Sequence, residues 1–164
     1  MMFKNLLKKS STPIQLKAPI TGEIVPLEKV PDPVFSQKMM GEGIAIIPKE
    51  ENVVAPADGT IIQIAPSKHA IGLKTNDDME ILIHVGLETV SLDGEGFNVL
   101  VEEGDHVSVG DKLMIVDFEL VRNKVPHIIT PMVITNSEQS NKEYNLTAET
   151  ECKAGQTSVL TING

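Results

Sequence analysis

The sequence predicts an all-β protein, an antiparallel β-sandwich or barrel with duplicated halves and short surface helices. Short runs of aliphatic and β-branched residues are separated by turns rich in Gly, Pro, Asp and Asn, which is typical of sandwiches and barrels. The motif A-P-x-x-G-x-I occurs at Ala18–Ile24 and again at Ala55–Ile61, 37 residues later. Proline fixes φ and glycine frees it, so each copy is expected to turn the chain into a strand. We interpret the copies as duplicated halves of one closed sheet.

Two segments are expected to form helices of one or two turns. Asp32–Met40 places three apolar side chains on one face, and Phe118–Val125 ends at Pro126, which cannot continue a helix. A very short strand with a turn at each end is expected within Gly104–Gly110. The other expected strands are Ile14–Lys17, Gly22–Pro26, Gly43–Ile47, Asn52–Ala55, Gly59–Ala65, Ala70–Lys74, Glu80–Val85, Asn98–Val101, Lys112–Asp117, Met132–Thr135 and Thr157–Thr161.

Length and charge limit the class of protein. The chain has 164 residues, enough for one ordinary domain with its own core. Its 23 acidic and 14 basic residues give a net charge of -9, which argues against a nucleic-acid partner and suits a basic protein partner. The single cysteine, Cys152, excludes an internal disulfide and favours a cytoplasmic location. No apolar run is long enough to span a membrane.

The first residues differ in character from the rest. We expect residues 1–14 to form a flexible, basic amphipathic arm and residues 15–164 to form the domain. Within the arm, apolar residues at helical spacing alternate with lysines, so transient contact of residues 1–11 with an anionic membrane surface is one interpretation. A merely positive, disordered arm is the other. The apolar positions are Phe3, Leu6 and Leu7.

A histidine interrupts an apolar strand at His84. Side chains alternate along a strand, so Ile81, Ile83 and Val85 are expected on one face and His84 on the other. Gly86 follows on the histidine's face and is expected to leave open space beside the ring. Taken alone, this pattern also fits a half-buried histidine bonded to a carbonyl group.

A second histidine, His69, lies 15 residues earlier and opens the preceding alternating run. We expect its ring on the face of Ile71 and Leu73, with the Ser67 hydroxyl near enough to orient it. If the two strands form a hairpin, the rings of His69 and His84 can meet, although a one-residue slip would separate them. The remaining histidines, His106 and His127, are expected at the surface.

A pair of histidines admits few chemistries. Zinc binding would need a third ligand, but neither H-x-H nor H-E-x-x-H occurs, so no metal site is predicted. No nucleophile elbow, Walker loop or kinase signature is present, so no nucleotide or other cofactor is expected. One imidazole can accept a phosphoryl group while the other stabilises its charge. The donor would then be another phosphorylated protein.

Three segments together resemble the glucose-class IIA component of the bacterial phosphoenolpyruvate-dependent sugar phosphotransferase system. The similarity runs from about residue 15 to the C-terminus, and it implies a compact antiparallel β-sandwich with short surface helices. The segments are Pro31–Gly43, Pro66–Ala70 and Ile83–Val90 with Leu92–Phe97.

The resemblance also implies roles. His84 would accept the phosphoryl group from the phosphohistidine of the carrier protein HPr through Nε2, and His69 would stabilise it. Ser67 stands where relatives carry a hydroxyl residue, more usually threonine, that orients the second imidazole. The group would pass to the cysteine of a IIB domain of a membrane sugar permease, without a metal.

A partner-binding surface is implied around the histidines. Asp32 and Glu88 match acidic positions that face a basic residue of the partner. Relatives often carry phenylalanine where Met39 and Leu82 stand. Ordinary core packing and solvated charge are the simpler interpretations of these residues. The apolar positions of this surface are Val34, Phe35, Met39, Met40, Leu82, Gly86 and Val90.

Three other functions compete with phosphoryl transfer. A biotinyl or lipoyl carrier would need a modifiable lysine at a hairpin tip in its own motif, and none is present. A zinc peptidase of related architecture would need the missing H-x-H. A purely regulatory protein, phosphorylated at His84 but acting by docking onto transporters or enzymes, stays open beside the transfer role.

Overall fold

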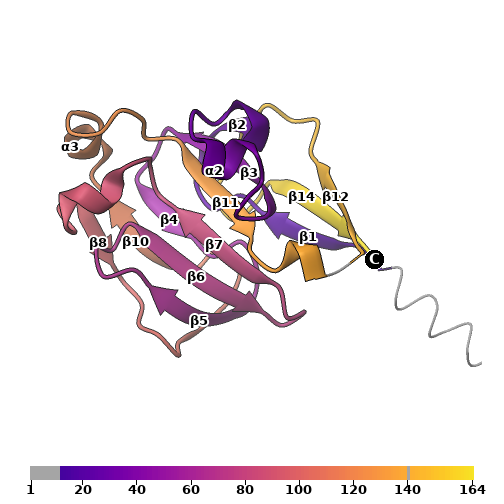
Figure 1. Ribbon diagram of the computed structural model, residues 1–164. Coiled ribbons are helices and arrows are strands. Elements are labelled where there is room, and N and C mark those ends of the chain that lie inside the picture. Colours follow the sequence, from indigo (N-terminus) through magenta and orange to yellow (C-terminus); the bar gives the residue numbers. More distant parts are fainter. Residues whose placement is uncertain (1–11, 140) are drawn as a thin grey trace, which may run out of the picture.

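The computed structural model describes residues 12–139 and 141–164, and it contains three antiparallel sheets (Figure 1). The largest has eight strands, whose spatial order is β13 (Glu151–Cys152), β2 (Gly22–Pro26), β3 (Glu42–Pro48), β11 (Thr130–Ile134), β7 (Glu80–His84), β6 (Ala70–Thr75), β5 (Gly59–Ile64) and β9 (His106–Val107).

Two three-stranded sheets complete the sandwich. One contains β1 (Ile14–Lys17), β14 (Ser158–Asn163) and β12 (Glu143–Leu146), and the other contains β4 (Asn52–Val54), β10 (Lys112–Val116) and β8 (Phe97–Val99). One continuous core joins them, with buried residues from all three sheets such as Leu16, Met114 and Ile81. The predicted all-β, antiparallel sandwich is confirmed.

The prediction of one closed sheet is wrong. Within the described residues the strands form three open sheets, because the chain leaves the large sheet after β3 and enters a small one at β4. Strands β12 and β13 were not predicted from the sequence, since the polar stretch around them lacks an apolar alternation. The expected strand Ile14–Lys17 forms as β1, so Ile14 belongs to the domain. Residues 1–11 of the predicted arm lie outside the described residues.

Both predicted helices form but are shorter than expected. Helix α2 spans Pro33–Ser36, and Asp32 caps it by accepting a hydrogen bond from the Val34 amide at 3.0 Å. It ends early because Lys38 adopts a left-handed conformation with φ of 57°. Helix α3 spans Phe118–Arg122. The described residues also form three 3-10 turns, η1 (Leu27–Lys29), η2 (Thr89–Leu92) and η3 (Ser137–Gln139).

The two A-P-x-x-G-x-I copies are related by equivalent hydrogen bonds. The Lys17 amide donates to the Pro56 carbonyl at 2.9 Å, and the Val54 amide donates to the Pro19 carbonyl at 2.8 Å. Each donor and each acceptor is shifted by the same 37 residues, as a local twofold relation between two halves requires. The duplication that the sequence predicted is therefore present in the packing.

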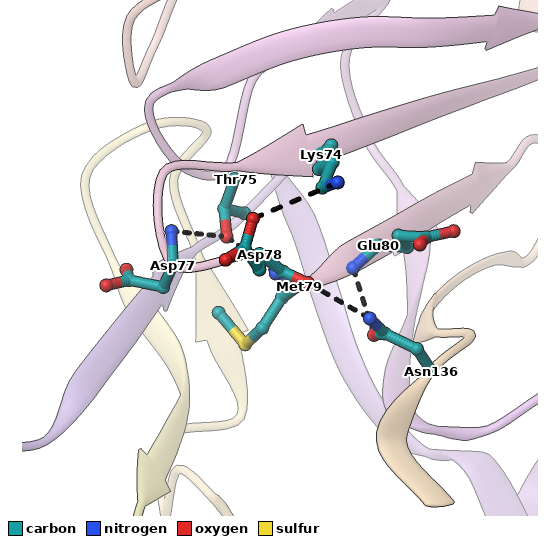
Figure 2. A network of polar contacts seen from close by, with 7 residues as sticks. All are labelled: Lys74, Thr75, Asp77, Asp78, Met79, Glu80 and Asn136. Atoms are coloured by element: carbon teal, nitrogen blue, oxygen red, sulfur yellow. Dashed lines mark hydrogen bonds and ion pairs between the residues drawn. The ribbon is translucent and has the colours of Figure 1, made fainter. Parts of the chain in front are cut away.

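The turn between β6 and β7 is built around a buried threonine. The Thr75 hydroxyl accepts from the amides of Asp77 and Met79 at 3.2 and 3.1 Å (Figure 2). Asp78 adopts a left-handed conformation with φ of 64°, which this short polar residue tolerates better than most. These hydrogen bonds fix where β6 ends and β7 begins, and the turn therefore sets the register in which the two strands pair.

Asn136, from the loop after β11, holds this hairpin from the side. Its Oδ1 accepts from the Glu80 amide and its Nδ2 donates to the Asp78 carbonyl, both at 3.0 Å (Figure 2). At the start of β7, the Asn136 side-chain amide therefore makes hydrogen bonds that a neighbouring strand's backbone would otherwise make. This ties the strand that carries His84 to its neighbour β11.

Candidate functional site

The hairpin β6–β7 brings the two histidines together. Ala70 lies opposite His84 in the ladder, and the Val85 amide donates to the His69 carbonyl at 2.8 Å. The ring centroids of His69 and His84 are 4.8 Å apart, and the ring planes meet edge to face at 79°. The predicted meeting of the rings is thus present in the structure.

The face predicted for His69 is wrong. Ile71 and Leu73 are fully buried in the core on the opposite side of the sheet from His84. His69 lies in the bend just before β6, where strand alternation no longer applies, and Lys68 before it has a positive φ of 62°. This bend turns the imidazole toward His84. Only 8% of His69 is exposed.

A backbone carbonyl orients the His84 ring. Nδ1 lies 2.8 Å from the Gly86 carbonyl oxygen, which can only accept, so Nδ1 carries the proton and donates it. In a neutral imidazole the other nitrogen, Nε2, then holds the free lone pair. The free lone pair of neutral His84 therefore lies on Nε2, and the tilted ring of Phe35, 5.3 Å away between centroids, packs beside the imidazole.

Glycine is favoured at position 86 by the backbone conformation there. The expectation that Gly86 leaves open space beside the His84 ring is wrong. It is buried, and its φ of +73° is a left-handed conformation that favours glycine. A Cβ there would lie 2.7 Å from the Thr89 methyl carbon. Thr89 is fully buried and its hydroxyl donates to the Val85 carbonyl at 2.7 Å. Thr89, which occupies the space beside Gly86, was not predicted from the sequence.

Both imidazoles are held toward their neutral forms. Burial lowers the pKa of His84, against weaker raising effects from the Gly86 carbonyl and the Asp32 carboxylate. Burial also lowers the pKa of His69, and the neighbouring His84 ring lowers it further. The backbone of Ser67 acts in the opposite direction. A neutral ring at neutral pH keeps its lone pair available.

Ser67 lies beside His69, but the described residues show no hydrogen bond from its hydroxyl to the ring. Nδ1 of His69 is buried and has no partner of good geometry among the residues that the structure places. The influence of Ser67 on the His69 pKa comes from its backbone. The residue is half-buried.

The apolar surface predicted around the histidines has a buried floor and an exposed rim. Phe35 is buried, while Met40 and Leu82 are half-buried against a second core cluster. Met39 and Val90 are 68% and 59% exposed, which is unusual for large apolar side chains. Val34 is also exposed, at 40%, and Gly86 is buried.

The two predicted acidic residues differ in setting. Asp32 is half-buried at the start of α2 and close enough to His84 to act on its pKa. Glu88 is exposed and adopts a left-handed conformation with φ of 62°. His106 and His127 are exposed, as predicted. Among residues 12–139 and 141–164, no group of three His, Cys, Asp or Glu side chains could hold a metal ion.

Comparison with known proteins agrees with this geometry. Residues 14–140 match the family described as phosphoenolpyruvate-dependent sugar phosphotransferase system, EIIA 1. The chain belongs to this EIIA family. A PTS system glucose-specific EIIA component of Halalkalibacterium halodurans is 52% identical over 145 residues, 88% of this chain and 83% of that protein. One from Oceanobacillus iheyensis is 48% identical and covers 98% of this chain and 99% of itself.

A solved structure supports the same assignment. Glucose permease IIA from Mycoplasma capricolum superposes with a TM-score of 0.84 at 39% identity, covering 92% of this chain and 96% of that one. Membership of the EIIA family excludes the biotinyl or lipoyl carrier and the zinc peptidase as interpretations. No helix in the described part of this EIIA chain is long and apolar enough to cross a membrane.

Proposed function

We propose that this EIIA chain is a phosphocarrier that accepts a phosphoryl group from HPr on Nε2 of His84 and passes it to the cysteine of a IIB domain of a glucose-class permease. The observation that carries the proposal is the 2.8 Å hydrogen bond from His84 Nδ1 to the Gly86 carbonyl. It leaves the Nε2 lone pair free and fixes the direction in which it points. The family and the glucose-specific names of the relatives support the same role.

The transfer balances without a metal or an added proton. The Nε2 lone pair forms a bond to phosphorus while the P–N bond of the HPr phosphohistidine breaks, and the HPr imidazole recovers its electron pair. Nδ1 of His84 keeps its proton, and the hydrogen bond to Gly86 stabilises the positive charge that phosphorylation gives the ring. In the onward step a cysteine thiolate attacks the same phosphorus and Nε2 leaves.

His69 is assigned to stabilise the phosphoryl group. Its ring approaches His84 edge to face, and an imidazole N–H beside the phosphoryl oxygens would donate to their negative charge. A buried ring also has little freedom to lose when the group arrives. Ser67 is assigned to orient His69, and its backbone supports this role more directly than its hydroxyl.

The surface around the histidines is assigned to partner docking. Exposed Met39, Val34 and Val90 would pack against an apolar patch of HPr or IIB and exclude water from the transferring group. Asp32 and Glu88 would face basic residues of the partner and speed encounter. A cytoplasmic location suits these partners, and regulatory docking through the same surface remains a second role.

Phosphate transfer from phosphoenolpyruvate through Enzyme I and HPr tests the assignment of His84. We expect acid-labile phosphate on the wild-type chain, none on His84→Ala, and wild-type labelling of the exposed control His106→Gln. His69→Gln should accept phosphate but pass it to IIB slowly. Labelling of His84→Ala at the wild-type level would contradict the acceptor assignment, and normal onward transfer by His69→Gln would remove the role of His69.

The docking surface has a matched test. Val90→Asp should raise the concentration of phospho-HPr needed for half-maximal transfer about tenfold or more, because a charge replaces an apolar contact at the interface. Val109→Asp is the control, since Val109 is 42% exposed and lies beside Asp58 and Asn76, at the opposite end of the β5–β6 strands from His69. Equal effects of the two variants would show that HPr docks elsewhere.

A further inference from the structure

A pocket separate from the histidine site lies beside the C-terminal end of helix α3 and the segment that follows it. Its volume is about 550 Å³, within the range of small-molecule sites. Most of its lining is aliphatic or proline side chains, including Val25, Val125 and Ile129. Lys29, Arg122 and His127 add the polar groups. None of the residues that we assign to transfer or partner docking lines this pocket.

The charge of this pocket is opposite to that of the chain as a whole. Arg122 is the only arginine in a chain of net charge -9, and both Arg122 and Lys29 are exposed. Neither has an ion-pair partner among the residues that the structure describes. Glu28, the sequence neighbour of Lys29, is paired with Lys38 at 3.3 Å instead.

No nearby carboxylate forms an ion pair with Arg122 in the described part of the chain. A smaller hollow of about 170 Å³ shares Arg122 with Lys49, Glu50 and Glu51, yet no carboxylate oxygen lies within 4.0 Å of the guanidinium. A guanidinium offers a planar fork of donors that matches a carboxylate in a bidentate pair. Two unpaired cations at the edge of an aliphatic hollow are complementary to a small acid with an apolar body.

We propose that this pocket binds a small amphipathic carboxylate, with its apolar body among the aliphatic side chains and its carboxylate on Arg122 and Lys29. The occupant is a single small molecule, because the lining combines apolar contact with a localised positive charge in a hollow of limited volume. This binding is independent of phosphoryl transfer and concerns a site that the proposed function does not use.

Two structural connections link the pocket to the histidine site. The His127 carbonyl accepts from the Leu87 amide at 3.0 Å, next to Gly86, whose carbonyl holds His84. The second core cluster contains both Ile129, which lines the pocket, and Phe35, which packs against His84. A ligand in the pocket therefore acts on elements that orient the phosphoryl acceptor, and this consequence rests on the proposed function.

Nuclear magnetic resonance titration of the full chain tests the binding. Octanoate is the probe and octanamide, its neutral counterpart, is the control ligand. We expect octanoate to shift the backbone amides of Val125 and of residues 127–129, with a smaller shift at the Leu87 amide. Octanamide should bind about tenfold more weakly or worse, because it cannot form the charge-assisted pair.

Substitutions at the cations make the test specific. Arg122→Gln should weaken octanoate binding about tenfold, Arg122→Lys less, and Lys112→Gln, an exposed lysine on β10, not at all. The amide spectrum of each variant shows whether it folds. Equal binding of octanoate and octanamide, unchanged binding by Arg122→Gln, shifts confined to other regions, or no shifts at millimolar octanoate would each overturn the proposal.

The phosphoryl-transfer readout separates the two proposals. We expect saturating octanoate to change the rate of labelling by phospho-HPr in the wild type and not in Arg122→Gln. A chain that binds octanoate at the pocket but takes no phosphate from HPr would overturn the proposed function and leave the pocket intact. Normal labelling without octanoate binding would overturn only the pocket.

Discussion

Gly86→Ala is expected to destabilise the chain by about 2–4 kcal/mol. The left-handed backbone conformation at this position is about 1–2 kcal/mol less favourable for alanine than for glycine. The new Cβ would also lie 2.7 Å from the Thr89 methyl carbon, too close for two carbon atoms. Thr89 is fully buried, so it can move only by weakening its 2.7 Å hydrogen bond to Val85, worth about 0.5–1.5 kcal/mol.

Phosphoryl acceptance by Gly86→Ala should fall about five- to tenfold even below its melting temperature. Any shift of the Gly86 carbonyl weakens the hydrogen bond that orients His84, and a loss of about 1 kcal/mol in the transition state corresponds to about this factor. Urea denaturation gives the stability, and the initial rate of labelling by phospho-HPr gives the effect on transfer. The melting temperature should fall by about 5–15 °C.

Two variants separate backbone strain from the clash. Gly104→Ala has a comparable φ of +98° but nothing within 4 Å of its Cβ, so it should lose only about 1–2 kcal/mol and transfer normally. Thr89→Ser removes the methyl carbon and keeps the hydroxyl, so it should partly rescue Gly86→Ala. Equal losses for Gly86→Ala and Gly104→Ala would refute the steric argument. Wild-type transfer by Gly86→Ala would refute the role of the carbonyl.

Three further predictions follow from the polar groups. Asn136→Ala should lower the free energy of unfolding measured in urea by about 1–3 kcal/mol, because it removes two hydrogen bonds that hold the β6–β7 hairpin. The exposed control Asn145→Ala should change this free energy little, and similar losses for the two variants would contradict the assignment. Folding lowers the pKa values of His69 and His84, so the unfolded chain binds more protons than the folded chain below pH 6.5. The free energy of unfolding should therefore fall as the pH drops from 6.5 toward the folded-state pKa values. His69→Gln should show a shallower slope. Burial shields the Cys152 thiol and raises its pKa. The reagent 5,5′-dithiobis(2-nitrobenzoate) should therefore react with it only in denaturant. Fast reaction of the native chain would show that Cys152 is accessible.

Local patterns in the sequence determined much of this fold. Alternation predicted that Ile81, Ile83 and Val85 share one face of their strand, and all three are buried together in the core. The repeated A-P-x-x-G-x-I motif predicted duplicated halves, which the reciprocal bonds of Pro19 and Pro56 confirm. These features depend on turn chemistry and on a period of two, both of which a sequence carries directly. The family was also identified from the sequence, through motifs around the two histidines.

Only the tertiary structure decided how the site is built. The bend before β6 turns His69 away from its expected face, and a pattern of alternation cannot describe a residue that lies outside the strand. The hydrogen bond from His84 to Gly86, which selects Nε2, depends on a left-handed glycine packed against Thr89. Arg122 reaches its pocket from a helix far from Lys29 in sequence. Such contacts join distant segments, so the physical reason is packing in three dimensions, which local residue patterns do not encode.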